Sequence, residues 1–349
     1  MAIASPVVSR LAFADLKHVP QQHYVLIAKP CKKSKKNKTT HKPLKRPLSK
    51  PFTPYYRGRF APSPSGPLHY GSLVTAVASY LQARCNRGLW QLRIEDIDPP
   101  REQKGAVRDI LSSLRAFGFD WDGSVLYQSH RLAYYRHIAE QLHKHHLAFY
   151  CECSRKQLMK SPETRLGRLY EGKCRKLGLP SLTGHTLRMR VDKEHIKFND
   201  GVFGVQSYDL LTDSGDYIVY RGDQLPSYTL AVSLDDLQQG YTELVRGADL
   251  LHLSARQLHL MQQFNRQLPQ LLHIPIITDA NGQKLSKQHY AAALDTRHSS
   301  FLLYCALKDL GQEPPKYLCY RSINYIWNWA YSHWRVSSIA PEMSIKQGF

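Results

Sequence analysis

The chain has 349 residues, of which 42% are hydrophobic and 22% charged; these proportions are typical of folded proteins and exclude a wholly disordered chain. It contains no run of about 18 uncharged apolar residues, so we expect no membrane span. Lysine and arginine outnumber aspartate and glutamate 48 to 28, and the resulting net charge of +20 favours a polyanionic partner such as a nucleic acid.

Much of the positive charge lies at the start of the chain. Residues 1–58 hold 13 basic side chains and one acidic one, Asp15, so +12 of the net charge lies there and +8 in the rest. Such a lysine- and proline-rich stretch buries too little apolar surface to offset the entropy of ordering. We therefore expect residues 1–54 to be a basic, disordered extension. An RNA-binding arm and an organelle transit peptide are the alternatives.

Regular structure is expected from about residue 55 onward. Residues 57–61 and 89–94 have strand composition, while residues 71–84 and 107–117 repeat apolar side chains at helical spacing. Strand, helix, strand and helix in that order predict an α/β protein with a parallel sheet. Residues 150–211 break this pattern and are interpreted as an insertion. Further on we expect helices at 130–147 and 253–264, a return of the α/β pattern at 217–219 and 230–234, and a strand at 274–277.

The first motif, RFAPSPSGPLHYGS, covers residues 59–72 and joins the first strand to the first helix. A helix N-terminus offers free N–H groups and the positive end of the helix dipole, which suits a phosphate. Gly71 would let a base or ribose approach the backbone, and His69 could donate to a phosphate oxygen. Taken alone, a His-x-Gly sequence is common and indicates an ordinary helix cap after a proline-rich loop.

The second motif is Lys284-Leu285-Ser286-Lys287, which follows the late strand and a turn. Two lysines three positions apart on a loop could hold a triphosphate. Taken alone, lysines in a loop are usually just solvated.

Together the two motifs resemble the signature sequences of the class I aminoacyl-tRNA synthetases of the glutamyl type. The resemblance runs from about residue 55 to about residue 296 and does not include residues 1–54. It implies a Rossmann-like fold and the activation of L-glutamate by ATP, with Mg²⁺ held mainly by phosphates and water. It also implies that His69, Gly71, Lys284 and Lys287 bind ATP, with His69 and the two lysines as the catalytic residues.

The amino-acid pocket follows from the chemistry of glutamate, which has two carboxylates and one ammonium group. Arginines suit the carboxylates, and an acidic side chain suits the ammonium group. The resemblance assigns glutamate binding to Arg59, Ala61, Ser63, Glu95, Tyr228 and Arg246. Without it, each charged residue would be interpreted as a surface ion pair and Tyr228 as a packed ring.

Three cysteines within 24 residues, Cys151, Cys153 and Cys174, favour a structural zinc ion. The total of seven cysteines is odd, which favours a reducing compartment over a disulfide framework. On chemical grounds the fourth ligand would be a histidine, and the candidates are His143, His145, His146 and His185. The resemblance instead implies Tyr170, four positions before Cys174. Unligated cysteines in a loop are the remaining alternative.

The C-terminal part is short, because 62 residues follow Lys287. A full glutamyl-tRNA synthetase continues with an anticodon-binding region, for which about 100–150 residues would be typical. The sequence is therefore similar to a shortened branch of the family that transfers glutamate to queuosine, at the wobble position of tRNA(Asp). This implies the queuosine-bearing anticodon stem-loop as the partner, and we expect a monomer in the cytoplasm with no membrane attachment.

The resemblance and the element pattern together divide the chain into five parts. These are a basic extension (1–54), the first half of a Rossmann-like catalytic domain (55–150), a zinc-containing insertion of the acceptor-binding type (151–212), the second half of the catalytic domain with the lysine loop (213–296), and a helical C-terminal region (297–349). In the last part, Trp327, Trp329 and Trp334 are more simply explained by core packing than by RNA stacking.

Three other functions stay open at this point. A truncated glutamyl-tRNA synthetase would charge the 3′ end of tRNA(Glu), and a non-catalytic relative would only bind RNA. A nucleotidyltransferase with the same kind of α/β fold would act on a different acceptor. The intact His69, Lys284 and Lys287 argue against the non-catalytic relative. The glutamate-binding set argues against the nucleotidyltransferase.

Overall fold

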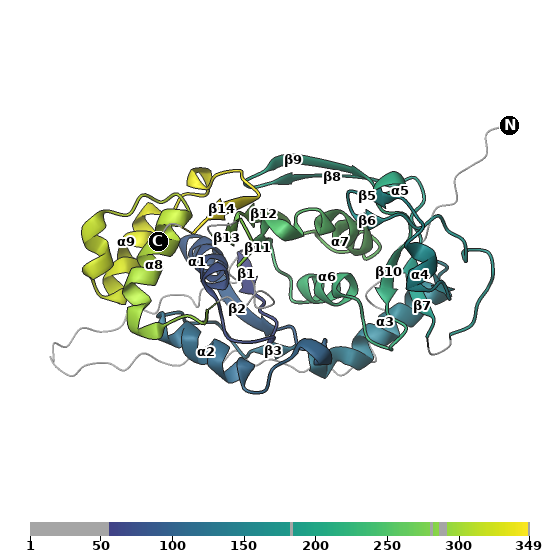
Figure 1. Ribbon diagram of the computed structural model, residues 1–349, viewed down its shortest axis with the longest axis horizontal. Helices are drawn as coiled ribbons and strands as arrows, with labels where there is room; N and C mark the ends of the chain where they lie inside the picture. The colour runs from purple at the N-terminus through teal and green to yellow at the C-terminus, as the bar shows by residue number, and fades with distance from the viewer. Residues whose placement is uncertain (1–55, 182–183, 280–281, 286–291, 348–349) are drawn as a thin grey trace, which may run out of the picture.

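In the computed structural model, residues 56–181, 184–279, 282–285 and 292–347 are described. The molecule is elongated, with a central sheet, the C-terminal helices at one end and the cysteine-containing segment at the other (Figure 1). The expected basic extension (1–54) and Lys287 lie outside the described residues.

The first half of the central sheet is parallel. Strands β1 (Arg57–Phe60), β2 (Leu89–Ile94) and β3 (Leu126–Tyr127) pair in that order, with Arg57 opposite Leu89. Helix α1 (Tyr70–Cys85) connects β1 to β2, and α2 (Ala106–Ala116) lies between β2 and β3. Parallel strands joined by helices confirm the α/β class predicted from the sequence.

The second half of the sheet has the order β11-β12-β8-β9. Strands β11 (Glu243–Gly247) and β12 (Gln270–Ile274) are parallel, and β11 lies beside β1, where the Thr242 amide donates to the Arg57 carbonyl over 3.0 Å. The long antiparallel hairpin of β8 (His195–Asp200) and β9 (Gly204–Asp209) joins β12 by a parallel pairing of Leu271 with Asp200. The β8–β9 hairpin therefore extends this sheet, although it precedes both β11 and β12 in the chain.

A second body carries the cysteine cluster. Its antiparallel sheet has the order β10 (Tyr217–Tyr220), β7 (Thr186–Met189), β4 (Ala148–Cys151). Helices α3 (Leu132–Lys144), α6 (Tyr228–Gln238) and α7 (Leu253–Met261) share a hydrophobic core with this sheet. The short elements here are α4 (Arg155–Leu158), β5 (Glu163–Thr164), β6 (Gly167–Arg168) and α5 (Leu210–Asp213).

The C-terminal helices α8 (Ser299–Asp309) and α9 (Ile323–His333) pack on α1. Trp327 is buried and donates its indole N–H to the Phe117 carbonyl over 3.0 Å, while Trp329 and Trp334 pack partly buried against the same core. The tryptophans are therefore packing residues, as expected. Strands β13 (Ile276–Thr278) and β14 (Ser344–Lys346) pair with each other in parallel.

The remaining regular elements are short 3₁₀ turns at Pro99–Arg101, Gln128–Arg131, Ala248–Leu250, Thr296–His298, Lys316–Tyr320 and Val336–Ser338. None of the helices in the described ranges is long and apolar enough to cross a membrane.

Candidate active site

The first motif forms the N-terminal end of α1. His69 is the N-cap residue, and its Nδ1 accepts from the Ser72 amide over 3.3 Å. A Cβ placed on Gly71 would lie 3.2 Å from the His69 ring and 3.7 Å from the carbonyl oxygen of Leu285. The two motifs, more than 200 residues apart in the sequence, therefore meet at Gly71. The N-terminal N–H groups of α1 and the start of the lysine motif therefore lie together, an arrangement that suits a phosphate ligand.

Lys284 pairs with an acidic residue next to the sheet. Its Nζ lies 2.5 Å from Oδ2 of Asp249, which follows β11. Both side chains are partly exposed, so this ion pair contributes little to stability and can be exchanged for a phosphate. The partner lysine of the motif, Lys287, is one of the residues that the structure does not describe.

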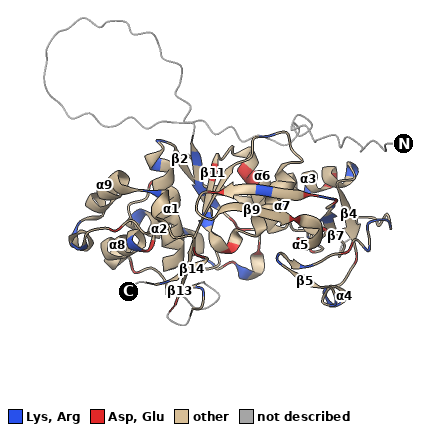
Figure 2. Ribbon diagram, turned by 90° about the horizontal axis from the view of Figure 1, so that it is seen from above, with Lys and Arg blue, Asp and Glu red and all other residues tan. Residues whose placement is uncertain are grey.

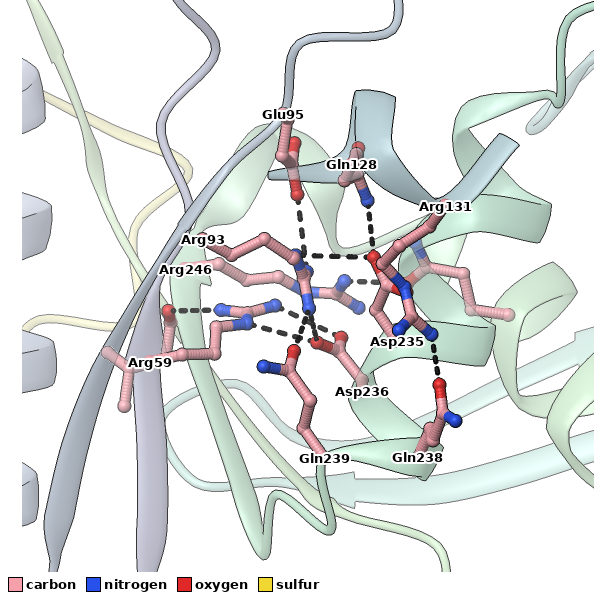
Figure 3. Close-up of polar contacts among 12 residues, drawn as sticks. Arg59, Arg93, Glu95, Gln128, Arg131, Asp235, Asp236, Gln238, Gln239 and Arg246 are labelled. Carbon is pink, nitrogen blue, oxygen red and sulfur yellow. Dashed lines mark hydrogen bonds and ion pairs between the residues drawn. The ribbon is translucent and has the colours of Figure 1, made fainter. Parts of the chain in front are cut away.

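Arg59 leaves the end of β1 and is buried against α6. Its Nε and Nη2 donate to the two carboxylate oxygens of Asp236 over 3.3 and 3.2 Å, and its Nη1 donates to the Val245 carbonyl (Figure 3). Asp236 also accepts from Nη1 of Arg93 over 2.6 Å. Burial alone would raise the pKa of Asp236, but the two guanidinium groups lower it, so the carboxylate stays ionised. Arg59 therefore has a counter-ion in direct contact inside the protein, which it shares with Arg93.

Glu95 follows directly after β2. Its carboxylate is 9% exposed and accepts from Nη2 of Arg93 over 3.2 Å, and its amide donates to the carbonyl of Pro62 in the first motif. Burial raises its pKa, although Arg93 and Arg59 oppose that effect. Glu95 thus lies next to the proline-rich loop of the first motif.

Arg246, in β11, is 4% exposed. Its guanidinium donates to Nε2 of His273 (2.9 Å), Oε1 of Gln257 (2.6 Å) and Oγ of Ser254 (2.8 Å), which are all neutral groups. It forms no ion pair with a carboxylate in the part of the chain that the structure describes, and burial lowers its pKa. A buried cation without a counter-ion is costly, so this place favours an anionic ligand.

Tyr228 opens α6 and is 37% exposed. Burial of its hydroxyl and the charge of Glu95 raise its pKa, while Arg246 and Arg59 lower it, so the phenol lies within electrostatic reach of all three. In the loop that follows β1, Ala61 is partly exposed and Ser63 is exposed. The structure thus brings the charged members of the sequence-derived glutamate set together around the ends of β1, β2 and β11.

The three cysteines predicted to bind metal form one cluster, with their Sγ atoms all within 4.8 Å of one another. The Sγ atoms of Cys153 and Cys174 are 3.5 Å apart. A tetrahedral zinc ion with Zn–S bonds of about 2.3 Å would set its sulfur ligands about 3.8 Å apart, so the cluster fits such an ion. These residues could therefore hold a metal ion.

A fourth donor lies beside the cysteines. The Tyr170 hydroxyl is 3.3 Å from Sγ of Cys151 and 3.8 Å from Sγ of Cys153. Within the described ranges, no histidine, aspartate or glutamate joins the group. His185 is exposed to an intermediate degree, with its Nδ1 3.0 Å from the Pro180 carbonyl oxygen. None of the candidate histidines thus joins the cluster in the described ranges, and the donors present are three thiols and a phenol.

The surroundings of the cluster favour anionic ligands. The Arg188 guanidinium lies 3.9 Å from the centre of the Tyr170 ring, where a cation stabilises negative charge. Burial opposes ionisation of Cys151, but hydrogen bonding by Tyr170 and the nearby Arg188 bring its pKa down to about 7. Burial and the neighbouring thiols raise the pKa of Cys153 to about 11. A bound dication would favour the ionised form of each ligand.

Sequence reasoning missed the buried residues that hold the site together. Arg93, Asp235 and Asp236 form an ion-pair network in which Asp235 also binds Arg131 and Gln128 (Figure 3). The available signal was a pair of adjacent acids in an otherwise apolar helix that starts at Tyr228. Adjacent acids buried on an apolar helix need basic partners, which a sequence pattern alone does not identify.

Fold and site together define an α/β enzyme of the class I synthetase type. Comparison with known proteins agrees, because the family model for "tRNA synthetases class I (E and Q), catalytic domain" matches residues 56–300. Two relatives are both named glutamyl-Q tRNA(Asp) synthetase. That of Aromatoleum aromaticum is 45% identical, with 83% of this chain and 92% of the relative covered. That of Chromobacterium violaceum is 45% identical, with 81% and 95% covered.

Among solved structures, a glutamate-tRNA synthetase from Elizabethkingia anophelis has the same fold, with a TM-score of 0.69 and 22% identity over 83% of this chain and 68% of that one. The chain therefore belongs to the glutamyl-Q tRNA(Asp) synthetase family, within the class I synthetases for glutamate and glutamine. The resemblance expected from the two motifs is confirmed.

Proposed function

We propose that this protein activates L-glutamate with ATP and transfers the glutamyl group to queuosine at the wobble position of tRNA(Asp). The observation that carries the proposal is the buried charge of Arg246, which no carboxylate of the described residues contacts, beside Glu95, Tyr228 and Arg59. An anionic amino acid supplies the missing negative charge. The family membership supports the acceptor, because the matched relatives are named for tRNA(Asp).

In the first step, a glutamate carboxylate oxygen attacks the α-phosphorus of ATP, the bond to the β-phosphate oxygen breaks, and pyrophosphate leaves. His69 and the backbone at Gly71 bind the phosphates at the N-terminal end of α1. Lys284 exchanges Asp249 for the triphosphate and, together with Lys287, stabilises the charge on the leaving pyrophosphate. Mg²⁺ accompanies ATP and is held by phosphate oxygens and water.

The glutamate lies across the strand ends. Arg59 and Arg246 bind its carboxylates, Glu95 accepts from its ammonium group, and Tyr228 donates its hydroxyl. Ala61 and Ser63 line the loop side of the pocket. In the second step, a queuosine hydroxyl attacks the carbonyl carbon, AMP leaves with the bonding electrons, and the hydroxyl proton passes to solvent.

The cysteine cluster is proposed to hold one structural zinc ion through Cys151, Cys153, Tyr170 and Cys174. Zinc would crosslink the segment after β4 to the segment before β7 and so fix the body that meets the RNA. We further propose that the protein works as a monomer in the cytoplasm, on the anticodon stem-loop of tRNA(Asp) with queuosine in place.

The test is transfer of labelled glutamate to tRNA pools with and without queuosine. We expect label on tRNA(Asp) and only in the pool that contains queuosine. Periodate treatment of that pool should abolish the label, because it cleaves the cyclopentene-diol. Label on tRNA(Glu) in both pools would instead make the protein a minimal glutamyl-tRNA synthetase. Absence of glutamate-dependent pyrophosphate exchange would reject activation itself.

A further inference from the structure

Arg246 is the first of three buried side chains that are connected in series by hydrogen bonds; the other two, His273 and Asp200, come from separate parts of the chain. Asp200 ends β8 and His273 lies in β12, and both side chains are fully inaccessible to solvent. Oδ2 of Asp200 is 2.6 Å from Nδ1 of His273, and Nε of Arg246 is 2.9 Å from Nε2 of the same ring. Neither Asp200 nor His273 has a role in the reaction steps given above.

The hydrogen bonds determine where the imidazole proton lies. A carboxylate only accepts, so Nδ1 of His273 carries the hydrogen and donates it to Asp200. Nε2 then has a lone pair, which accepts the Nε hydrogen of Arg246. The ring is neutral, because burial and the charge of Arg246 bring its pKa down to about 4 despite the nearby carboxylate.

This arrangement treats Arg246 differently from Arg59. Arg59 is bound directly by the carboxylate of Asp236, whereas a whole imidazole ring separates Arg246 from the carboxylate of Asp200. Arg246 is thus held at all three nitrogens by neutral acceptors. Its orientation is fixed, while no carboxylate among the residues that the structure describes contacts its charge.

We propose that Asp200 and His273 are positioning residues that align Arg246 for a substrate carboxylate and thereby set the preference for glutamate over glutamine. Glutamine has nearly the same shape as glutamate, but its side-chain amide brings no negative charge to the guanidinium of Arg246. If Arg246 were misaligned, it would lose its directed ionic contact with the glutamate carboxylate. The preference for glutamate over glutamine would fall with that contact. The inference rests on the proposed function, because it assumes that Arg246 binds glutamate.

The pair also links the site to the β8–β9 hairpin. Oδ1 of Asp200 accepts from the amides of Val202 and Phe203, both over 3.0 Å, and so caps the turn of the hairpin. A change at Asp200 therefore disturbs the hairpin as well as the ring. His273 is the cleaner position for a test, since the hydrogen bonds of its ring within the described part of the chain are those with Asp200, Arg246 and Ser254.

The experiment measures glutamate-dependent pyrophosphate exchange for the full chain carrying His273→Leu or His273→Gln. We expect His273→Leu to raise the KM for glutamate at least tenfold, to leave the KM for ATP within twofold, and to lower the glutamate-to-glutamine ratio of kcat/KM. In His273→Gln an amide oxygen replaces Nε2 as the acceptor for Arg246. This variant should recover most of the glutamate KM.

The matched control is His259→Leu. His259 is also buried, its Nδ1 is 2.9 Å from the Tyr217 hydroxyl, and burial lowers its pKa to about 4 as well, yet it does not contact Arg246. This control should lose stability without a selective rise in the glutamate KM. A fourth variant, Asp200→Asn, has one side-chain oxygen where the carboxylate has two. With that oxygen accepting from the hairpin amides, its NH2 group faces Nδ1 of His273, so this variant should also raise the KM for glutamate.

The outcomes distinguish failure of the proposed function from failure of the positioning role. If the wild type shows no glutamate-dependent exchange, the proposed function fails before the positioning role is reached. If the wild type is active but His273→Leu raises both KM values alike, or changes them no more than His259→Leu does, the positioning role is rejected. A glutamate KM that stays at the wild-type value in both His273 variants would reject it too.

Discussion

At the scale of single residues, the site depends on how each buried charge is balanced. Asp236 is fully buried and pairs with both Arg59 and Arg93. Both arginines are buried too, so water cannot take the place of this carboxylate. Removing one partner of such a group is far more costly than the net value of the pair, because the other charges stay buried. Asp236 therefore supports the fold and the glutamate pocket through the same contacts.

We predict that Asp236→Asn lowers the free energy of unfolding by about 3–5 kcal/mol, because it leaves two buried arginines without their shared counter-ion. The control is Asp109→Asn, since Asp109 pairs with Arg108 on the surface with 49% and 82% of the side chains exposed. That change should cost less than about 1 kcal/mol. Urea denaturation of both variants measures the difference. Equal, small losses would contradict a charge-balancing role for Asp236.

The lowered pKa of buried His259 makes the stability of the protein depend on pH. Its pKa is about 4 in the folded protein and about 6.5 in an unfolded chain, so the unfolded state takes up a proton first as the pH falls. The contribution is complete above about pH 6.5 and is lost as the pH falls toward 4. Between pH 7 and pH 5 it amounts to about 2 kcal/mol. His259→Gln should shrink the measured drop in unfolding free energy by that amount, and an unchanged drop would argue that the ring is protonated when folded.

At the scale of elements, local pattern predicted the regular parts of the fold well. The helix expected at 71–84 is Tyr70–Cys85, and the strand expected at 89–94 is Leu89–Ile94, because apolar periodicity and strand composition lie within each segment. The single strand expected at 274–277 is in fact two, since β12 ends at Ile274 and β13 begins at Ile276, on either side of Pro275. Proline cannot donate to a sheet, which explains the break.

Pairing between distant segments was not predictable in this way. The β8–β9 hairpin lies in the stretch interpreted as an insertion, yet it joins β12 about 70 residues later. Sheet pairing is decided by tertiary packing, for which neither segment carries a local signal. Asp200 and His273 were not predicted for the same reason, because they meet only when these distant strands come together. The motif residues were recognised because each motif is a short continuous stretch of sequence. The sequence thus predicted which motif and pocket residues lie together, but it did not predict the residues that support them.

A glycine beside Tyr170 tests the proposed fourth zinc ligand. Gly215 has φ of +60°, and a Cβ there would lie 2.8 Å from the Tyr170 amide nitrogen and closer still to its carbonyl oxygen. Gly178 has the same φ, with no atom within 4 Å of its Cβ position. Gly178→Ala should lower the free energy of unfolding by about 1–2 kcal/mol from backbone strain alone.

Gly215→Ala should cost that strain plus a further amount of about 1–3 kcal/mol, because the backbone of Tyr170 must move. The movement should also lower the zinc content of the purified protein, measured by releasing the metal under denaturing conditions. Gly178→Ala is expected to keep its zinc. Equal zinc content in the two variants would mean that the position of Tyr170 does not matter for metal binding.

At the scale of the whole molecule, the sheet that carries the site lies between the C-terminal helices and the cysteine-containing body (Figure 1). The basic residues of the described part are spread over both ends and the middle and are interspersed with acids (Figure 2). Such a mixed surface produces only moderate attraction for RNA. The largest block of positive charge in the sequence is residues 1–54, outside the described residues, with 12 basic side chains and one acidic one.

We therefore predict that residues 1–54 add phosphate contacts to tRNA binding. Deleting them should weaken tRNA affinity at low salt and flatten the dependence of affinity on salt by roughly 0.7–0.9 logarithmic units for each phosphate that the segment neutralises. A full-length variant with Lys32, Lys33, Lys35, Lys36 and Lys38 changed to Gln keeps the length and should reproduce part of this flattening. Glutamate-dependent pyrophosphate exchange should stay unchanged in both, because activation needs no RNA in the proposed reaction. Affinity that follows the same salt dependence with and without the segment would show that its charge does not reach the tRNA.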